Sequence, residues 1–442
     1  MLTSVFQTLE TYPEPIFFVG GCLRQFLLNL PIHDYDFVCE GSAIGIAKRL
    51  SKQFDIPYFV LDAERDIARV VISQEDTLDF ASLQEDSLLQ DLALRDLSIN
   101  AMAYPVSVAL LEGHLDSALL IDPTGGYADL QHGVIRGLAE ANFVSDPLRL
   151  LRVFRFAAQH GFSIAPETLQ WVEQHGPLLK HSAIERILSE FEKILRSDPA
   201  PAMLQKMFEQ GFLSQVIPLD TNTLEANLRM FWSLTPLLAE QRSVYFQDCL
   251  TGERSRRQLC LLFVLCFGTY FRHLHGSILD EMSSGVSDGI NAKNIMSACK
   301  QKMPIIKALS NSEWSFLQRV CAGLLFLSTE SIGDNVQKSR FFRQVKSEAE
   351  ATFLLARVIF ATQEEIQLAL AEMSAMWKTP GHPVAYPQDF LSGHRIAELL
   401  NEKPGPHIGL VLNQLMDAQA MGLVSDEASA VAFVTNLSAD NS

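Results

Sequence analysis

Two aspartates, Asp34 and Asp36, are separated by a single residue and follow a glycine pair and an arginine in the chain. Because alternate residues of a β-strand point to the same face, a strand at this place would bring both carboxylates together. One or two carboxylates plus substrate phosphates are the usual ligands of Mg²⁺. Gly21 lets the backbone approach a phosphate closely, and Arg24 can clamp it. The pattern therefore predicts a site for a metal-bound nucleoside triphosphate.

Each part of this pattern also has a plainer interpretation. A Gly-Gly pair after a strand is most often a turn, and two spaced aspartates usually mark a solvated face. The order of the parts favours the site, because an apolar strand, two glycines, an arginine, an apolar helix and an aspartate-bearing strand follow one another. A turn and a solvated face do not predict that order.

A second polar run lies at residues 94–102. Arg95 supplies a fixed cation, Asp96 an acceptor for a hydroxyl, and Asn100 a neutral donor and acceptor. These groups suit a triphosphate and a ribose. The alternative is a solvated helix start with Asp96 as its N-cap.

A third run, residues 122–136, opens with Asp-Pro-Thr-Gly-Gly. This is a turn sequence. We expect it to form a structural junction that closes the first domain, with no catalytic role.

A fourth run places Arg149, Arg152 and Arg155 at intervals of three residues. Asp146 and Pro147 precede them and predict a helix with Asp146 as cap and Pro147 in the first turn. At 3.6 residues per turn the three arginines form one basic stripe. A solvated arginine face is the usual explanation of such a stripe. In an acidic chain that carries a predicted metal site, we favour phosphate and base binding.

Composition limits what the protein can be. The chain has 442 residues, enough for roughly three domains, and 48% of them are apolar. The net charge of −17 argues against non-specific binding of nucleic acid, which depends on Lys and Arg. The 7 cysteines are odd in number and contain no Cys-x-x-Cys, so we expect buried free thiols in a reducing cytosol.

The sequence predicts neither a signal peptide nor a membrane-spanning segment. Its first residues lack a basic region before an apolar run, so no signal peptide is predicted. The apolar run at residues 259–267 is too short to span a bilayer. We therefore expect a cytoplasmic protein with no membrane contact.

The pattern of apolar residues predicts an α+β protein. Strands are expected at residues 16–19, 36–39, 58–61, 68–72 and 77–80, and helices at 23–30 and 44–54. From about residue 138 onward the apolar spacing is helical. Turn-rich breaks lie at 197–201, 216–223, 283–291, 331–334 and 379–387, and a helix is expected from the Gly-Pro-His-Ile-Gly run at 405–409 to about 421.

Together these runs resemble the class II tRNA nucleotidyltransferase and bacterial poly(A) polymerase family, within the polymerase-β-like nucleotidyltransferases. The resemblance covers roughly residues 14–200, where the motifs occur in the family's order, and Glu185-Arg186-Ile187 with Glu190 is similar to its neck signature. It implies a catalytic head at 1–137, a helical neck at 138–210 with the nucleotide-selecting helix, a helical body at 211–330 and an RNA-binding helical tail at 331–442.

The family adds CMP and AMP to the 3′ end of tRNA without a nucleic-acid template. The resemblance implies that Asp34 and Asp36 bind Mg²⁺ and activate the terminal hydroxyl, with Asp79 as a possible third carboxylate. It implies that Asp146 and Arg149 pair with the base of CTP or ATP. The triphosphate and its surroundings would be held by the remaining glycine and basic residues, Gly21, Arg24, Arg95, Arg152 and Arg155.

Three positions depart from the family's pattern. Gln25 stands where an aspartate usually follows the arginine, Leu94 replaces the first of two arginines, and Ser145 replaces an acid. An acidic neighbour often orients an arginine, so these changes leave open how Arg24 and Arg149 are oriented. They are also the reason to weigh a non-catalytic RNA-binding relative.

The product is left open among CC, A and CCA ends and a poly(A) tail. Members that add the final A use a flexible loop between the metal strand and the ribose motif, and here the connection from Asp79 to Arg95 is short. A short connection favours an enzyme that adds CC only. A poly(A) polymerase is the nearest alternative.

Overall fold

The computed structural model describes residues 1–197, 200–241, 243–250, 254–282, 295–297, 303–329 and 332–440. The chain divides into two compact units, Met1–Val216 and Ile217–Ser442. The first unit contains the expected head and neck together, and its end lies close to the expected end of the neck at residue 210. The predicted breaks at 283–291, and parts of those at 197–201 and 331–334, lie outside the described residues.

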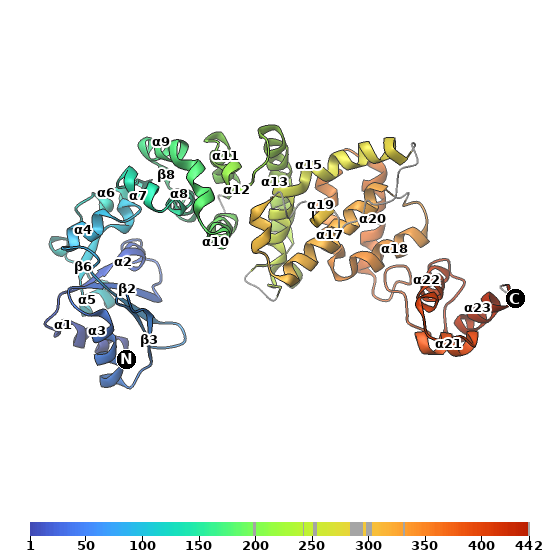
Figure 1. Ribbon diagram of the computed structural model, residues 1–442, viewed down its shortest axis with the longest axis horizontal. Coiled ribbons are helices and arrows are strands. Elements are labelled where there is room, and N and C mark those ends of the chain that lie inside the picture. The colour runs from blue at the N-terminus through green and yellow to red at the C-terminus, as the bar shows by residue number, and fades with distance from the viewer. Residues whose placement is uncertain are drawn as a thin grey trace. The chain divides into compact units, whose positions relative to one another are not determined.

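A six-stranded mixed sheet forms the centre of the head (Figure 1). Its strand order is β3-β4-β5-β2-β1-β6. The β2–β5 pair is parallel and the other pairs are antiparallel. The strands are β1 (Ile16–Val19), β2 (Asp34–Cys39), β3 (Tyr58–Asp62), β4 (Ile67–Val71), β5 (Thr77–Ser82) and β6 (Ala103–Pro105). All five predicted strands are confirmed, and the short edge strand β6 was not predicted.

The two faces of β2 have opposite roles. Its odd-numbered side chains, including Phe37, are buried, and the Phe37 ring stacks on Phe80 of β5 with 5.0 Å between ring centroids. Phe6 of α1 meets Phe37 edge-on. Because the side chains of a strand alternate, this aromatic packing turns the even-numbered aspartates to the other face.

The helices of the first unit alternate with the strands of the head and then form the neck. Helix α2 begins at Gly20, three residues before the expected start at residue 23, because the glycine pair is itself the first turn of the helix. The helices are α1 (Leu2–Glu10), α2 (Gly20–Leu27), α3 (Ala43–Phe54), α4 (Leu88–Ala93), α5 (Val108–Leu111), α6 (Gly126–His132), α7 (Glu140–Ser145), α8 (Leu148–His160), α9 (Pro166–His175), α10 (Ile184–Leu195), α11 (Ala200–Glu209) and α12 (Leu213–Val216). Short 3₁₀ turns lie at Ser98–Asn100, Ser117–Leu119 and Gly176–His181.

Head and neck are joined by backbone pairing. Strand β7 (Val134–Ile135) pairs in parallel with β8 (Ser163–Ile164), one strand before and the other after α8. Helix α8 packs against α10, and Phe154 stacks on Phe212 with 5.2 Å between ring centroids. The β7–β8 pair thereby connects the two ends of α8 to the last strand of the head.

The described part of the second unit consists of helices and the loops that connect them. Its helices are α13 (Thr221–Glu240), α14 (Val244–Gln247), α15 (Arg256–Met282), α17 (Asn311–Thr329), α18 (Asn335–Val345), α19 (Ala349–Ile359), α20 (Glu364–Lys378), α21 (Gly393–Leu400), α22 (Pro406–Ala420) and α23 (Glu427–Asp440), with 3₁₀ turns at Pro304–Ala308 and Lys346–Glu348. The predicted break at 379–387 connects α20 to α21, and α22 is the helix predicted after residue 405.

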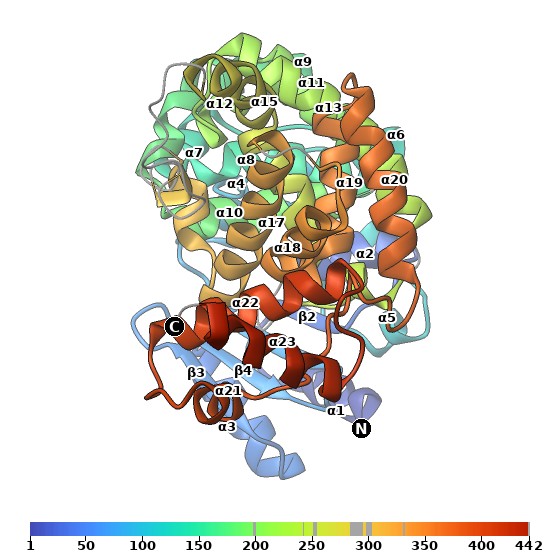
Figure 2. The same cartoon turned by 90° about the vertical axis from the view of Figure 1, so that its right-hand side faces the viewer.

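The last three helices, α21 to α23, gather around a small apolar core of their own (Figure 2). Asp417 of α22 accepts hydrogen bonds from Arg340, at 2.5 Å, and Arg343, both on α18. This ion-pair cluster attaches α22 to the preceding helices.

Two predictions from composition are tested by the described residues. Of the six cysteines that the structure describes, five are buried as expected. Cys249 is exposed, so the prediction was wrong for this residue, and Cys299 lies outside the described residues. None of the helices described here is long and apolar enough to cross a membrane.

Candidate active site

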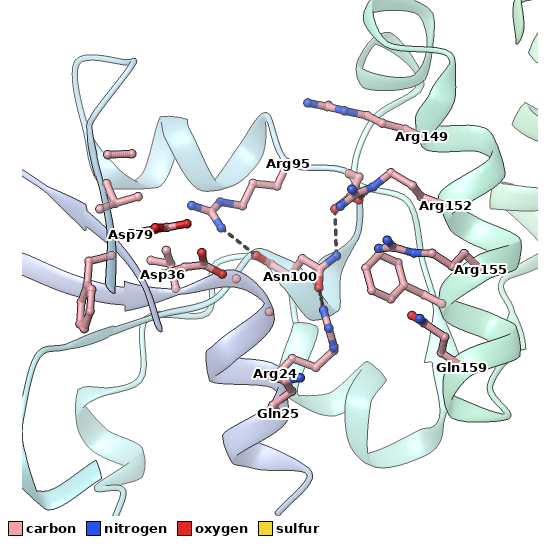
Figure 3. Close-up of a pocket in the computed structure, with 18 of the residues that line it drawn as sticks. Arg24, Gln25, Asp36, Asp79, Arg95, Asn100, Arg149, Arg152, Arg155 and Gln159 are labelled. Atoms are coloured by element: carbon pink, nitrogen blue, oxygen red, sulfur yellow. Dashed lines mark hydrogen bonds and ion pairs between the residues drawn. The ribbon is translucent and has the colours of Figure 1, made fainter. Parts of the chain in front are cut away.

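A cavity of about 1020 Å³ lies in the first unit where the sheet, the start of α2 and helix α8 meet (Figure 3). It brings together residues that are far apart in the chain. Of the predicted site residues, those lining it are Gly21, Arg24, Asp36, Asp79, Arg95, Asp96, Asn100, Asp146, Arg149, Arg152 and Arg155. Asp34 is not among the lining residues.

The acidic end of the cavity contains Asp36 and Asp79, which lie directly opposite each other on the parallel strands β2 and β5. Burial and the neighbouring Asp79 raise the pKa of Asp36 to about 6. Among the described residues, no hydrogen bond or ion pair neutralises the Asp36 carboxylate. A half-buried carboxylate without a partner fits a bound cation, because the cation would supply the missing counter-charge.

The other two aspartates are already engaged. Both oxygens of Asp79 accept from Arg69, each at 2.7 Å, so Asp79 has a counter-ion of its own. Asp34 is exposed at the first residue of β2, shares the face of Asp36, and accepts from the Thr77 hydroxyl at 2.7 Å. In the described part of the chain, no three His, Cys, Asp or Glu side chains form a metal-binding group. The protein therefore offers a small carboxylate set, which suits a metal that is completed by substrate phosphates.

The beginning of α2 forms the floor of the cavity beside Asp36. Gly20 has a φ of +71°, and a Cβ on it would lie 3.2 Å from Nη1 of Arg95. A Cβ on Gly21 would lie 3.8 Å from Oδ2 of Asp36. The glycines thus keep the first turn of α2 open, and the unpaired N–H groups of a helix N-terminus favour a phosphate there.

Arg24, on the same helix, is buried and points into the cavity. It donates to the side-chain oxygen of Asn100, and its guanidinium lies 4.6 Å from the ring centroid of Phe156. Burial and the nearby Arg155 lower the pKa of Arg24 to about 10, which leaves it a cation at neutral pH. Asn100 and Phe156 therefore orient Arg24, while Gln25 lines the cavity beside it.

The run after α4 is organised around Asp96. This carboxylate is 6% exposed and accepts from Arg152 at 2.6 Å, from the Asn100 amide at 3.0 Å and from the N–H of Leu97 at 2.9 Å. Asp96 is not the N-cap of the following 3₁₀ turn, whose N-cap is Leu97. Asp96 positions Asn100 and Arg152 at the cavity wall, and Arg95 is held by Asp91 at 3.2 Å.

Helix α8 begins at Leu148, one residue later than expected, with Pro147 as its N-cap. Asp146 therefore stays in extended backbone and does not cap the helix as predicted. Its carboxylate accepts from the N–H of Leu148 at 3.3 Å and from Arg186 at 3.4 Å. Asp146 and Arg149 both line the cavity at this end of the helix.

Arg149 is oriented by backbone oxygens. Its Nη1 donates to the carbonyl of Leu94 at 2.7 Å and to that of Asn142 at 3.4 Å. Ser145 donates to the same Asn142 carbonyl at 3.0 Å. Arg149 is thus held in place without the arginine and the acid that the family usually has at positions 94 and 145.

Two arginines of the basic stripe, together with Arg24, surround the aromatic ring of Phe156, which was not predicted as a site residue. Arg155, Arg24 and Arg152 lie 3.9, 4.6 and 5.4 Å from the ring centroid of Phe156. Arg155 also pairs with Glu190 at 3.1 Å. An aromatic residue next to the stripe was the available signal, because guanidinium groups pack on aromatic faces. Gln159 and His160 of α8 also line the cavity and were missed, although Gln159 lies four residues after Arg155 on the same helix face. Lys193 of α10 and Arg69 of β4 were missed because no spacing in the sequence connects them to the motifs.

The run at residues 122–136 lies outside the cavity lining. The Asp122 carboxylate accepts from the N–H groups of Gly126 at 2.8 Å and Tyr127 at 2.9 Å and so caps α6. A Cβ on Gly126 would lie 2.1 Å from the carbonyl oxygen of Ser98. Only glycine fits this contact between α6 and the segment that carries Asn100.

Family models match two parts of the chain. Residues 16–136 match the "Poly A polymerase head domain", and residues 161–221 match the "Probable RNA and SrmB-binding site of polymerase A". The CC-adding tRNA nucleotidyltransferase of Synechocystis sp. is 28% identical over 97% of this chain and 95% of its own length. That of Geobacter sulfurreducens is 38% identical over 46% of this chain and 45% of its own length, and the A-adding tRNA nucleotidyltransferase of Deinococcus radiodurans is 26% identical over 96% of each.

Solved structures share the fold over nearly the whole chain. A CCA-adding enzyme in its apo form has a TM-score of 0.68 at 23% identity, covering 98% of this chain and 93% of its own. The Thermotoga maritima CCA-adding enzyme in complex with tRNA has a TM-score of 0.64 at 22% identity, covering 98% and 95%. The chain is thus similar in sequence to tRNA nucleotidyltransferases, and its fold is that of CCA-adding enzymes.

These similarities confirm the α+β fold and the prediction that the chain is a nucleotidyltransferase. Nucleotidyltransferases of this kind use a divalent metal, and the Asp36 carboxylate is a group in this cavity that fits one. Four parts of the chain line the cavity: β1, β2, the segment after α4, and α8. They follow one another along the chain in the family's order of motifs.

Proposed function

We propose that this chain is a template-independent enzyme that adds CMP, from CTP, to the 3′ end of tRNA. The observation that carries the proposal is the single cavity that joins three functions: the Asp36 carboxylate, the glycine and Arg24 cradle, and the Asp146 and Arg149 pair. A metal-bound triphosphate whose base reaches α8 would use all three. The relatives that match almost the whole chain or about half of it carry tRNA nucleotidyltransferase names, which supports the same substrate.

In the proposed reaction the terminal 3′-oxygen of the RNA attacks the α-phosphorus, the bond to the bridging oxygen breaks, and pyrophosphate leaves. Asp34 and Asp36 would hold Mg²⁺, which supplies charge neutralisation at the phosphates and a lower pKa for the attacking hydroxyl. Gly21, Arg24 and Arg95 bind the triphosphate and keep it in line with the hydroxyl. Asp79 contributes negative charge beside Asp36, with Arg69 as its counter-ion.

The base is selected by Asp146 and Arg149 in this proposal. A carboxylate accepts from the exocyclic amine of C or A, and a guanidinium donates to a ring nitrogen or carbonyl. G and U carry a carbonyl oxygen, which is an acceptor, at the position where A and C carry the exocyclic amine. Arg152 and Arg155 add positive charge along the same helix face, which favours the phosphates and the sugar.

Short connections in the head favour CC addition over CCA addition. Residues 63–66 join β3 to β4, residues 72–76 join β4 to β5, and residues 83–87 join β5 to α4. None of these connections offers the long flexible loop expected of members that add the final A. The names of the two CC-adding relatives support this choice.

The test is incorporation of labelled CMP and AMP by the purified protein. The substrates are tRNA ending before CCA, at C and at CC, each supplied with Mg²⁺ and CTP, ATP or both. We expect CMP to be added to the first two substrates and AMP not to be added to the third. Long tails made from ATP alone on unstructured RNA would identify a poly(A) polymerase. Binding of tRNA without incorporation under any metal would identify a non-catalytic relative.

We also propose that the neck at 138–210 and the tail at 331–442 contact the RNA. The match of residues 161–221 to an RNA-binding family model supports the neck contact. The separate core of α21 to α23 supports a tail that acts as a unit. The cysteines of the described residues are mostly buried, which supports a reducing compartment, and we propose the cytoplasm.

A further inference from the structure

A row of side chains crosses four strands of the sheet at the level of Asp36. Asp36 lies opposite Asp79, Asp79 opposite Arg69, and Arg69 opposite Phe59 on the edge strand β3. Residues directly opposite each other on paired strands point to the same face. Phe59 therefore shares the sheet face of the carboxylates.

Phe59 is exposed together with its neighbours on β3, Val60 and Leu61, and is the aromatic residue among the three. Its side chain is 55% exposed, although aromatic side chains of a sheet are normally covered. The aromatic pairs of the head, such as Phe37 with Phe80, lie on the opposite face. Phe59 thus presents an open aromatic surface at the end of a row that begins with the predicted metal ligand.

The geometry of the proposed displacement indicates that the RNA end, which carries the attacking hydroxyl, would reach Phe59. The triphosphate cradle of Gly21 and Arg24 lies on the β1 and α2 side of Asp36. In an in-line displacement, the attacking oxygen enters opposite the leaving pyrophosphate. The RNA end would then approach from the other side of Asp36, where β5, β4 and β3 follow in order.

The spacing of the sheet fits a strand of RNA. Three inter-strand steps of about 4.8 Å separate Asp36 from Phe59, a distance of about 14 Å. A stacked nucleic-acid strand rises about 3.4 Å per nucleotide, so about 14 Å corresponds to a few nucleotides at most. Arg69 lies between the two residues and is 39% exposed, which leaves part of its guanidinium accessible to a phosphate.

We propose that Phe59 is a stacking platform for an unpaired base of the RNA 3′ end, a few nucleotides upstream of the reacting hydroxyl, and that Arg69 supports the intervening backbone. This rests on the proposed function, since it assumes an RNA end at the carboxylates. Every base has an aromatic face, so the platform would grip the RNA end without reading its sequence. Phe59 would position the primer and take no part in the chemistry.

The test compares three full-length variants. Phe59→Ala removes the platform, Phe59→Trp keeps an aromatic face, and Val60→Ala is the matched control. Val60 is the next residue of β3, is 47% exposed, and points to the opposite face. The readouts are KM for tRNA ending before CCA, KM for CTP, kcat, and tRNA affinity by filter binding in EDTA, where no turnover occurs.

We expect Phe59→Ala to raise both the KM and the Kd for tRNA by about 5- to 100-fold, the range measured when a stacking aromatic is truncated. KM for CTP and kcat at saturating tRNA should stay near the wild-type values. Phe59→Trp should restore tRNA binding, and Val60→Ala should behave as wild type.

Two results would overturn the platform. One is an unchanged KM and Kd for tRNA in Phe59→Ala. The other is an equal effect of Phe59→Ala and Val60→Ala together with a changed oligomeric state, which would mean that the β3 edge binds a second copy of the chain. Failure of the proposed function would look different, because the wild-type protein itself would not add nucleotides to tRNA.

Discussion

Arg152 of α8 donates to the buried Asp96 carboxylate, with 2.6 Å between Nε and Oδ2. The contact joins the neck helix to the segment that follows α4. Burial alone would raise the pKa of Asp96, but Arg152, Asn100 and the N–H of Leu97 outweigh it and lower this pKa. The pair therefore fixes the geometry of the cavity wall only while Asp96 is ionised.

Replacing Asp96 by asparagine should destabilise the first unit. Asp96→Asn leaves Arg152, whose side chain is 33% exposed, without its anion. We expect the free energy of unfolding at pH 7 to fall by about 1–3 kcal/mol, measured by urea unfolding. Asp86→Asn, at an exposed position before α4, is the control and should have no measurable effect.

The effect of Asp96→Asn should also depend on pH. A carboxyl with a lowered pKa contributes stability above the unfolded value of about 3.9, and this contribution is lost as the pH falls through the lower, folded value. The difference between wild type and Asp96→Asn should therefore shrink below about pH 4. A difference that is unchanged at acid pH would contradict this account of the pair.

Activity should depend on the ionisation of Asp36, whose pKa is raised to about 6. A protonated carboxyl does not bind a metal, so CMP incorporation should fall as the pH drops below 6, and its midpoint should move lower as Mg²⁺ is increased. Asp36→Asn should abolish incorporation at every pH. A pH–rate profile that does not respond to the Mg²⁺ concentration would argue against Asp36 as a ligand.

The ionised Asp36 carboxylate should lower the free energy of unfolding when no metal is bound. A raised pKa means that the ionised form is disfavoured in the fold, so the penalty is present above the unfolded pKa. We expect Asp36→Asn to raise the free energy of unfolding of the metal-free protein at pH 7 by about 1–3 kcal/mol. Urea unfolding in EDTA measures this, and a destabilised Asp36→Asn would show a structural role.

Arg149 should decide which nucleotide is used. Arg149→Ala removes the guanidinium that would donate to cytosine, so kcat/KM for CTP should fall by about 10- to 100-fold and the preference for CTP over UTP should shrink. Competition assays with the four nucleoside triphosphates measure the preference. Arg229→Ala, at an exposed position on α13, should leave it unchanged.

Two adjacent glycines provide a matched test of the junction between α6 and the segment that carries Asn100. Gly126→Ala would place a Cβ 2.1 Å from the Ser98 carbonyl, and the backbone there must move. Gly125→Ala meets no atom within 4 Å and only has to adopt a φ of +74°. We expect Gly125→Ala to cost about 1 kcal/mol and Gly126→Ala clearly more, with reduced activity. Equal losses would show that the contact with Ser98 is not tight.

The tail should affect RNA binding and leave nucleotide binding unchanged. Asp417→Asn removes the anion between Arg340 and Arg343, which attaches α22 to α18. If the tail contacts RNA as proposed, the KM for tRNA should rise severalfold while the KM for CTP stays constant. An unchanged KM for tRNA in Asp417→Asn would contradict a tail contact with RNA.

Much of the head could be predicted from local sequence. The alternation of apolar and polar residues is a property of a single strand, so it identified all five predicted strands and put Asp34 and Asp36 on one face. The helical spacing of Arg149, Arg152 and Arg155 likewise placed all three on the cavity side of α8. These features depend on residues close together in the chain.

Only the tertiary structure decided which partners these residues have. Strand order and register set Asp79 opposite Asp36 and Arg69 opposite Asp79, and they left Asp34 outside the cavity lining. The packing of α8 on the head brought Arg152 to Asp96 and placed three guanidiniums around Phe156. Sequence spacing cannot reveal such contacts, because residues far apart in the chain meet only once the sheet and the neck helices have packed together.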